Sequence, residues 1–221
     1  MKFNQSGREC FETELELRTL VQRLRASPIS NIVNDRLRSF SAMQSKGFEE
    51  WFSELCFCIL VANSPARKVY RVMQSTDAEA LINLSENELR KRLKTLGVRF
   101  HNRAGFIVQA RRTTDLKERV LSFATPFKAR YWLVENFKGI GYKEASHFLR
   151  NVGFFDLAIL DRHIISVLRS MDRVGLPGTP KSPKQYLELE RFYLDLSTSL
   201  GTRPGELDLY LWYVRTGDIV K

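Results

Sequence analysis

Apolar residues recur with a helical period along nearly the whole chain. The apolar side chains of residues 9–25 fall mostly on one face of a helix, whereas residues 51–62 are apolar almost all round. The first pattern is typical of an amphipathic helix and the second of a helix buried inside a lobe. Because no alternating run with turn chemistry indicates a strand, we expect an all-α fold. The predicted helices are 9–25, 51–62, 85–96, 102–112, 115–124, 128–137, 142–152, 162–171, 183–200 and 204–215.

Cap and turn residues mark some of the boundaries between these helices. Ser85-Glu-Asn-Glu88 has the spacing of a capping box, and Gly97 follows the predicted helix as its stop. The stretch Gly175-Leu-Pro-Gly-Thr-Pro-Lys-Ser-Pro183 cannot continue a helix and separates two helical segments. It is therefore the best candidate for a linker.

The composition fits one compact unit or two small lobes. The chain has 221 residues, enough for a core that needs neither a metal nor disulfides. Its three cysteines show no metal-ligand spacing, and we expect small buried side chains in a reduced compartment. The first residues lack the apolar core of a signal peptide, and no apolar run approaches the roughly 20 residues that span a bilayer. We therefore expect a soluble, intracellular protein without a membrane partner.

The charge balance favours a polyanionic partner. The formal net charge is +10, and nucleic acid is the commonest polyanion that such proteins bind. Basic residues crowd into two stretches, at 67–71 and 90–112, whereas the first predicted helix is acidic. Solvated helix faces would give the same clusters, so charge alone does not establish DNA binding.

The sequence Gly139-Ile140-Gly141 lies between two predicted helices. Two glycines around one apolar residue let the backbone turn tightly, and Ile140 can pin the turn between the helices. Backbone N–H groups at the start of the second helix would then face outward as an anion site suited to a DNA phosphate. We therefore predict a helix-hairpin-helix at about 128–152.

Lys143 and Asp161 are the candidate catalytic residues. Lys143 lies in the first turn of the second helix, where the helix dipole and burial would lower the pKa of the amine and make it nucleophilic. Taken alone, it could equally touch a phosphate as a point charge. Asp161 follows a run expected to be buried and precedes an apolar-periodic helix, a position that also suits an N-cap. We expect the nearby His163 to be a structural or supporting residue and not a base.

The residues GIGYKEASHFLRN, at 139–151, and AILDRHI, at 158–164, resemble the helix-hairpin-helix/Gly-Pro-Asp superfamily of DNA glycosylases. They look closest to the small archaeal-type (type 2) 8-oxoguanine DNA glycosylase/AP lyases, and the resemblance extends from about Trp51 to the last residue. Monofunctional members lack the lysine after the hairpin, so Lys143 implies a bifunctional enzyme. AIL stands where other branches have Gly-Pro or Pro-Val, a departure that the small branch tolerates. The four-cysteine iron–sulfur loop of the endonuclease III branch is absent, so we expect no metal and no other cofactor.

The resemblance implies a reaction on double-stranded DNA that contains 8-oxoguanine. The damaged nucleotide would be flipped into a pocket, Lys143 would attack C1′ of the sugar, and Asp161 would stabilise the positive charge that develops there. β-Elimination from the resulting Schiff base would cut the strand 3′ to the lesion.

Two loops resemble DNA-contacting parts of the family. Val61-Ala-Asn63-Ser-Pro65 is similar to the loop whose amide residue fills the gap left by the flipped base, so Asn63 is a candidate wedge; an ordinary helix stop has the same composition. Arg99-Phe100-His101-Asn102-Arg103 resembles the family's RF-x-N-[KR] stretch, and we expect Arg99 and Arg103 to bind DNA. Phe100 would stack on the flipped base, unless it is a core phenylalanine.

The C-terminal stretch, from Leu209 to Lys221, is largely apolar and aromatic and reaches the last residue. In the type 2 branch, a tryptophan nine residues before a terminal lysine helps to form the base pocket, and Trp212 and Lys221 have this spacing. The resemblance implies that Trp212 and Phe100 sandwich 8-oxoguanine, while the Lys221 carboxylate accepts a hydrogen bond from N7–H, a donor that guanine lacks. Composition alone would predict only a packed C-terminal helix.

The expected architecture has two lobes with a DNA cleft between them. A central helical bundle, 42–146, would contain the hairpin and Lys143. The N-terminal helices, 1–41, and the C-terminal part, 147–221, would form the second lobe with Asp161. We expect a monomer. Two alternatives stay open: a non-catalytic helix-hairpin-helix module that only binds DNA, and a glycosylase for another oxidised base, such as an oxidised pyrimidine.

Overall fold

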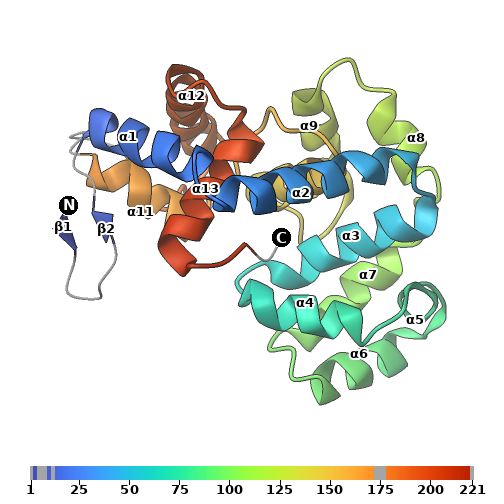
Figure 1. The fold of residues 1–221 in the computed structure, drawn as a ribbon. Helices are drawn as coiled ribbons and strands as arrows, with labels where there is room; N and C mark the ends of the chain where they lie inside the picture. Colours follow the sequence, from blue (N-terminus) through green and yellow to red (C-terminus); the bar gives the residue numbers. More distant parts are fainter. Residues whose placement is uncertain (1, 4–8, 11–12, 172–177, 220–221) are drawn as a thin grey trace. The chain divides into compact units, whose positions relative to one another are not determined.

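Helices make up nearly all the regular structure of the computed structural model, which describes residues 2–3, 9–10, 13–171 and 178–219 (Figure 1). The expected all-α fold is confirmed. The α-helices are α1 (Glu14–Arg25), α2 (Ile29–Ala42), α3 (Phe48–Val61), α4 (Ala66–Gln74), α5 (Ala78–Asn83), α6 (Glu86–Thr95), α7 (Ala104–Ala110), α8 (Leu116–Leu121), α9 (Pro126–Asn136), α10 (Tyr142–Asn151), α11 (Arg162–Ser170), α12 (Pro183–Ser199) and α13 (Pro204–Thr216). Short 3-10 helices, η1 (Met43–Ser45) and η2 (His101–Arg103), precede α3 and α7.

The helix prediction is wrong for residues 9, 10 and 13, whereas residues 11–12 lie outside the described residues, and the expectation that the chain has no strand is also wrong. Two short strands, β1 (Lys2–Phe3) and β2 (Glu9–Cys10), pair antiparallel near the N-terminus. The helix begins only at Glu14, because Thr13 and Glu16 form a capping box. The Thr13 side chain accepts from the Glu16 N–H, and the Glu16 carboxylate accepts from the Thr13 N–H. This reciprocal pair sets the boundary that the apolar pattern extended too far.

No bounds were predicted for the helices α2, α4 and α5. α2 is largely polar, and α4 buries only Val69 and Val72. α5 is one short segment opened by Asp77, whose carboxylate accepts from the Ala80 N–H at 2.7 Å. α4 is amphipathic, but with nine residues it is too short for a periodic pattern to identify a helix.

The chain divides into two compact units, and α3 is the centre of the one formed by residues 40–154. It packs against α4, α5, α7, α8 and α10, and its residues from Leu55 to Leu60 are completely buried. This explains why the helix is apolar almost all round. A buried polar chain joins α3 to α10: Asn151 donates to Glu54 Oε1 at 2.7 Å, and Arg150 donates to Asn151 Oδ1 at 2.9 Å.

The other unit combines residues 1–39 with 155–219. In it, α13 packs against both α11 and α12. Two polar contacts attach α1 to this group, although it is far away in the sequence. Ser199 Oγ donates to Glu14 Oε1 at 2.7 Å, and Arg25 Nη1 donates to the Gly201 carbonyl at 3.3 Å. The N-terminal helix therefore packs with the C-terminal third of the chain.

The predicted linker at 175–183 is described only in part. Residues 175–177 lie outside the described residues, 178–182 have no helix or strand, and α12 begins at Pro183. Across the part of the chain that the structure describes, no helix has the length and apolarity needed to cross a membrane.

Candidate active site

The predicted hairpin joins α9 to α10. α9 ends at Asn136, and Gly139 then adopts a φ of +84°, which L-residues rarely adopt. A Cβ at this position would lie 2.7 Å from Cδ2 of Phe106, so both the backbone and the available space exclude a side chain. Ile140 is buried, and its N–H donates to the Phe137 carbonyl at 3.2 Å. The helix-hairpin-helix is therefore confirmed.

A buried arginine holds the two helices of the hairpin together. Arg130 of α9 is 2% exposed, and its Nη1 donates to Ser146 Oγ of α10 at 3.1 Å. Its guanidinium carbon also lies 5.1 Å from the centre of the Tyr142 ring. Because Tyr142 is the first residue of α10, these contacts position the helix end at which Gly141 is the N-cap and Lys143 the second residue.

The amine of Lys143 is held by a neighbouring carboxylate. Its Nζ lies 2.8 Å from Oε1 of Glu144, and the two side chains are 26% and 13% exposed. Adjacent residues of a helix normally point away from each other, so the spacing of the sequence did not indicate this pair. The contact orients the amine, and Lys143 stays the predicted nucleophile.

Arg103, which we expect to bind DNA, is buried and bonded to the end of α3. Its Nη1 donates to the carbonyls of Leu60, at 3.0 Å, and Ala62. Burial lowers the pKa of the guanidinium, and the nearby Glu144 carboxylate partly opposes this shift. These bonds support the loop that contains Asn63. A contact of Arg103 with DNA stays a prediction.

Phe100 lies between two guanidinium groups. The guanidinium carbon of Arg103 is 4.6 Å from the centre of the ring, and that of the exposed Arg99 is 5.2 Å away. The ring itself is half-buried, so it is not a core phenylalanine in the sense of a fully enclosed side chain. Cation–π contacts of this kind fix the ring and leave part of it accessible.

Asn63 has an unusual backbone conformation. Its φ of +53° makes it the one non-glycine with positive φ among the described residues, and its side chain is exposed. Asparagine tolerates this left-handed region better than most residues do. The turn is closed by the Ser64 N–H, which donates to the Val61 carbonyl at 2.9 Å. The structure therefore presents an amide side chain at the tip of a tight, internally bonded turn.

In the other unit, Asp161 is the N-cap of α11. Its Oδ1 accepts from the N–H groups of His163, at 2.8 Å, and Ile164, at 2.9 Å. Within the described residues, no group donates a hydrogen bond to Oδ2. Two side chains of α12 hold the buried run before it: the Tyr186 hydroxyl donates to the Ala158 carbonyl at 2.8 Å, and Glu190 Oε1 accepts from the Ala158 N–H at 3.2 Å. Asp161 thus occupies a rigid position with one carboxylate oxygen unused.

Trp212 lies close to Asp161 through His163. The rings of Trp212 and His163 meet edge to face, with their centres 4.9 Å apart and their planes at 78°. The indole is half-buried, and its Nε1 is buried without a hydrogen-bond partner among the described residues. His163 therefore serves as a packing residue, in line with the supporting role expected for it. Lys221, the predicted partner of Trp212 in base recognition, lies outside the described residues.

The predicted site residues fall into two groups. Residues 40–154 hold Lys143, Phe100, Arg99 and Asn63, linked by contacts of Arg103 and Glu144, whereas Asp161 and Trp212 belong to the unit of α11–α13. No three His, Cys, Asp or Glu side chains are grouped as metal ligands in the part of the chain that the structure describes.

Comparison with known proteins identifies the family. A family model of 8-oxoguanine DNA glycosylases, Ogg-HhH, matches residues 33–202. The chain belongs to this family. The 8-oxoguanine DNA glycosylase/AP lyase of Methanocaldococcus jannaschii is 44% identical over 202 residues, which cover 91% of this chain and 97% of that protein. The enzyme of the same name from Thermotoga maritima is 42% identical over 213 residues, covering 93% and 99%.

Solved structures of the family share the fold. The crystal structure of the M. jannaschii 8-oxoguanine DNA glycosylase matches with a TM-score of 0.89 at 43% identity, covering 94% of this chain and 97% of that one. A second crystal structure of that enzyme, in complex with a 15-mer DNA containing 8-oxoguanine, also gives a TM-score of 0.89, at 42% identity, and covers 93% and 100%. The family resemblance of the sequence is confirmed, as is the helix-hairpin-helix glycosylase fold.

Proposed function

We propose that this member of the family is a bifunctional enzyme that excises 8-oxoguanine from double-stranded DNA and then cleaves the strand as an AP lyase. The observation that supports this most strongly is the position of Lys143. It lies in the first turn of α10, directly after the hairpin, with a half-buried and oriented amine. The relatives that share this region are named as 8-oxoguanine DNA glycosylase/AP lyases. We further propose that the enzyme acts as a monomer, without a metal or other cofactor.

The first step is extrusion of the damaged nucleotide from the duplex, since its C1′ cannot be reached inside the base stack. The exposed Asn63 amide fills the space that the base leaves. Its tight turn, supported by Arg103, keeps the amide in place while the stack is open. Backbone N–H groups after Gly141 bind a phosphate at the start of α10.

In the second step the neutral amine of Lys143 forms a bond to C1′, and the bond from C1′ to N9 of the base breaks. The base leaves with the electron pair of that bond and takes up a proton. Asp161 stabilises the positive charge that develops on the sugar, through the oxygen Oδ2 that α11 does not use.

In the third step the sugar opens to a Schiff base with Lys143, which acidifies the hydrogens on C2′. Removal of one C2′ proton breaks the C3′–O3′ bond, and the 3′ phosphate leaves with its electron pair. Base recognition precedes this chemistry: Phe100 and Trp212 stack on the base, and the Lys221 carboxylate accepts from N7–H.

Borohydride trapping tests the proposal. A duplex with one 8-oxoguanine should yield a covalent adduct with the wild-type protein, because reduction fixes the Schiff base. Lys143→Gln should give no adduct, and Asp161→Asn should lose most of it while retaining the N-cap hydrogen bonds. An intact DNA complex without any adduct in the wild type would favour the non-catalytic module.

The choice of base is tested separately. A panel of duplexes with different oxidised bases should show strand cleavage fastest at 8-oxoguanine, and removal of Lys221 should reduce the preference over guanine. Faster cleavage at an oxidised pyrimidine would mean that the proposed reaction is right and that the substrate is an oxidised pyrimidine and not 8-oxoguanine.

A further inference from the structure

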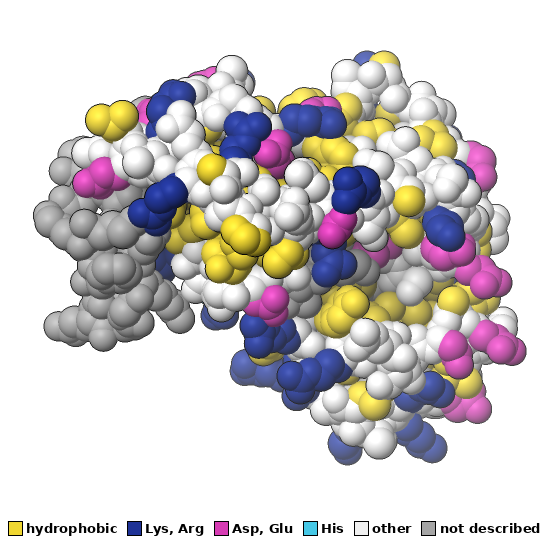
Figure 2. Space-filling model, viewed as in Figure 1, with side chains coloured by type: hydrophobic (Ala, Val, Ile, Leu, Met, Phe, Trp, Pro, Cys, Tyr) yellow, Lys and Arg dark blue, Asp and Glu magenta, His cyan; other side chains and the backbone are white. Residues whose placement is uncertain are grey.

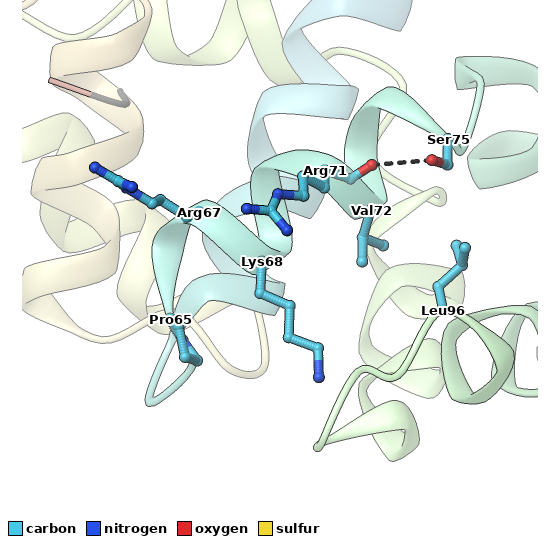
Figure 3. A pocket seen from close by; sticks show the side chains of 7 residues that line it. All are labelled: Pro65, Arg67, Lys68, Arg71, Val72, Ser75 and Leu96. Carbon is cyan, nitrogen blue, oxygen red and sulfur yellow. Dashed lines mark hydrogen bonds between the residues drawn. The ribbon is translucent and has the colours of Figure 1, made fainter. Parts of the chain in front are cut away.

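The helix α4, which follows the Asn63 turn, has a strongly basic exposed side. Figure 2 shows Lys and Arg side chains gathered over α4 and the neighbouring α6 at the lower edge of the view. Arg67, Lys68 and Arg71 of α4 line a cavity of about 440 Å³ (Figure 3). The remaining lining residues are apolar, apart from one hydroxyl, and none is acidic: Pro65, Val72, Ser75 and Leu96.

Two of the three cations of this cavity, Lys68 and Arg71, are not neutralised within the described part of the chain. Lys68 and Arg71 form no ion pair with any described residue, whereas Arg90 of α6 and Arg119 of α8 pair with acids one turn away. α4 has no acidic residue in its first turn, although the helix dipole disfavours cations there. Arg67 and Arg71 are also like charges one turn apart. The arrangement destabilises an isolated α4, and a bound anion would offset that effect.

The walls of the cavity are fixed before any ligand arrives. Arg92 of α6 donates to the Ser75 carbonyl at 2.8 Å, which attaches the end of α4 to α6. Lys68 extends across the turn that follows α6, so that a Cβ on Gly97 would lie 3.2 Å from its Nζ. The floor is apolar, because Val72 is buried and Leu96 is half-buried. Cations around an apolar floor match a phosphate attached to a sugar.

We propose that this α4 cavity binds the sugar–phosphate backbone of the duplex beside the lesion. The inference rests on the proposed function, since it takes DNA as the ligand, and it adds a second backbone contact to the one at the hairpin. Lys68 and Arg71 bind phosphate oxygens, and the deoxyribose packs on Pro65 and Leu96. Pro65 is only two residues from Asn63, so the cavity binds the backbone close to the wedge. Such contacts position the duplex without reading its sequence.

The test is the salt dependence of DNA binding by Lys68→Gln/Arg71→Gln. Fluorescence anisotropy gives Kd for two duplexes, one undamaged and one with 8-oxoguanine, over a range of KCl concentrations. Loss of two phosphate contacts should reduce the slope of log Kd against log [KCl] by about 1.8 and weaken binding roughly ten- to fifty-fold at 0.1 M KCl. Both duplexes should be affected equally, because a backbone contact does not depend on the base.

Two further variants keep the test decisive. Lys184→Gln/Arg191→Gln removes the same charges from the exposed face of α12 and should leave Kd within about twofold. Lys68→Arg should retain the slope of log Kd against log [KCl], because the site requires a positive charge and not a lysine in particular. An unchanged slope in Lys68→Gln/Arg71→Gln would overturn the proposal, and so would a loss confined to the damaged duplex. Because the undamaged duplex needs no base excision, this result is independent of whether the adduct of the proposed reaction forms.

Discussion

At the scale of single residues, the two oxygens of Asp161 differ in what they contact. Oδ1 caps α11 by accepting from two N–H groups, and in the proposed reaction Oδ2 stabilises the charge on the sugar. The sequence suggested both a cap and a catalytic carboxylate, and the geometry makes them compatible. The two functions can therefore be separated by substitution.

Asp161→Ala should lower the free energy of unfolding by about 1 kcal/mol, because α11 loses its N-cap. Asp161→Asn keeps an oxygen acceptor and should stay within about 0.5 kcal/mol of the wild type. Urea denaturation at pH 7 measures both. Equal destabilisation by the two substitutions would mean that the negative charge, and not the cap, stabilises the helix.

Residue roles were the hardest part to predict. Lys143, Gly139 and Asp161 stand where motif spacing places them, because hairpins and caps are local in sequence. Arg103 donates hydrogen bonds to carbonyls that lie about forty residues earlier in the sequence, and no local pattern indicates such a contact. Glu144 was missed because its contact with Lys143 depends on side-chain directions, not on residue spacing.

At the scale of elements, the strongly apolar helices could be predicted, and the polar or short ones could not. α3 and α10 bury many side chains, whereas α4 is amphipathic but only nine residues long. The turn between α9 and α10 is the element on which the site depends most. Its geometry requires a glycine at position 139 for two separate reasons, positive φ and contact with Phe106.

Gly139→Ala should lower the free energy of unfolding by about 3 kcal/mol, through backbone strain and the clash with the Phe106 ring. Gly201→Ala is the matched control, because Gly201 has a φ of +64° with no atom within 4 Å of an added Cβ. It should cost only about 1 kcal/mol of strain. Chemical denaturation of both variants isolates the steric contribution, and similar losses would show that the ring of Phe106 moves aside freely.

At the scale of the whole molecule, a buried cysteine of α3 makes the free energy of unfolding depend on pH in the alkaline range. Burial raises the pKa of the Cys56 thiol far above its ordinary value of 9.0, and nearby Arg111 opposes this only in part. In the unfolded chain the thiol ionises above pH 9, while the folded protein keeps it protonated. The unfolded state then binds fewer protons, so stability falls as the pH rises above 9 and is unaffected below it.

This contribution should reach about 1.4 kcal/mol per pH unit above pH 9. Urea denaturation of the wild type and Cys56→Ala between pH 8 and pH 10.5 gives two curves of free energy against pH. They should run parallel up to about pH 9, offset by the packing that the variant loses, and above it the wild type should fall more steeply. Parallel curves over the whole range would contradict a buried, neutral thiol.

The attachment of α1 to the C-terminal third has a consequence for the order in which the protein folds on the ribosome. Glu14 contacts Ser199, which is synthesised 185 residues later. At typical rates of elongation, α1 leaves the ribosome roughly ten to forty seconds before its partners exist. Residues 40–154 form a complete unit and can fold during that interval. The nascent chain thus builds the unit with the lysine first, and the unit with the aspartate closes only after Ser199 and α13 have been synthesised.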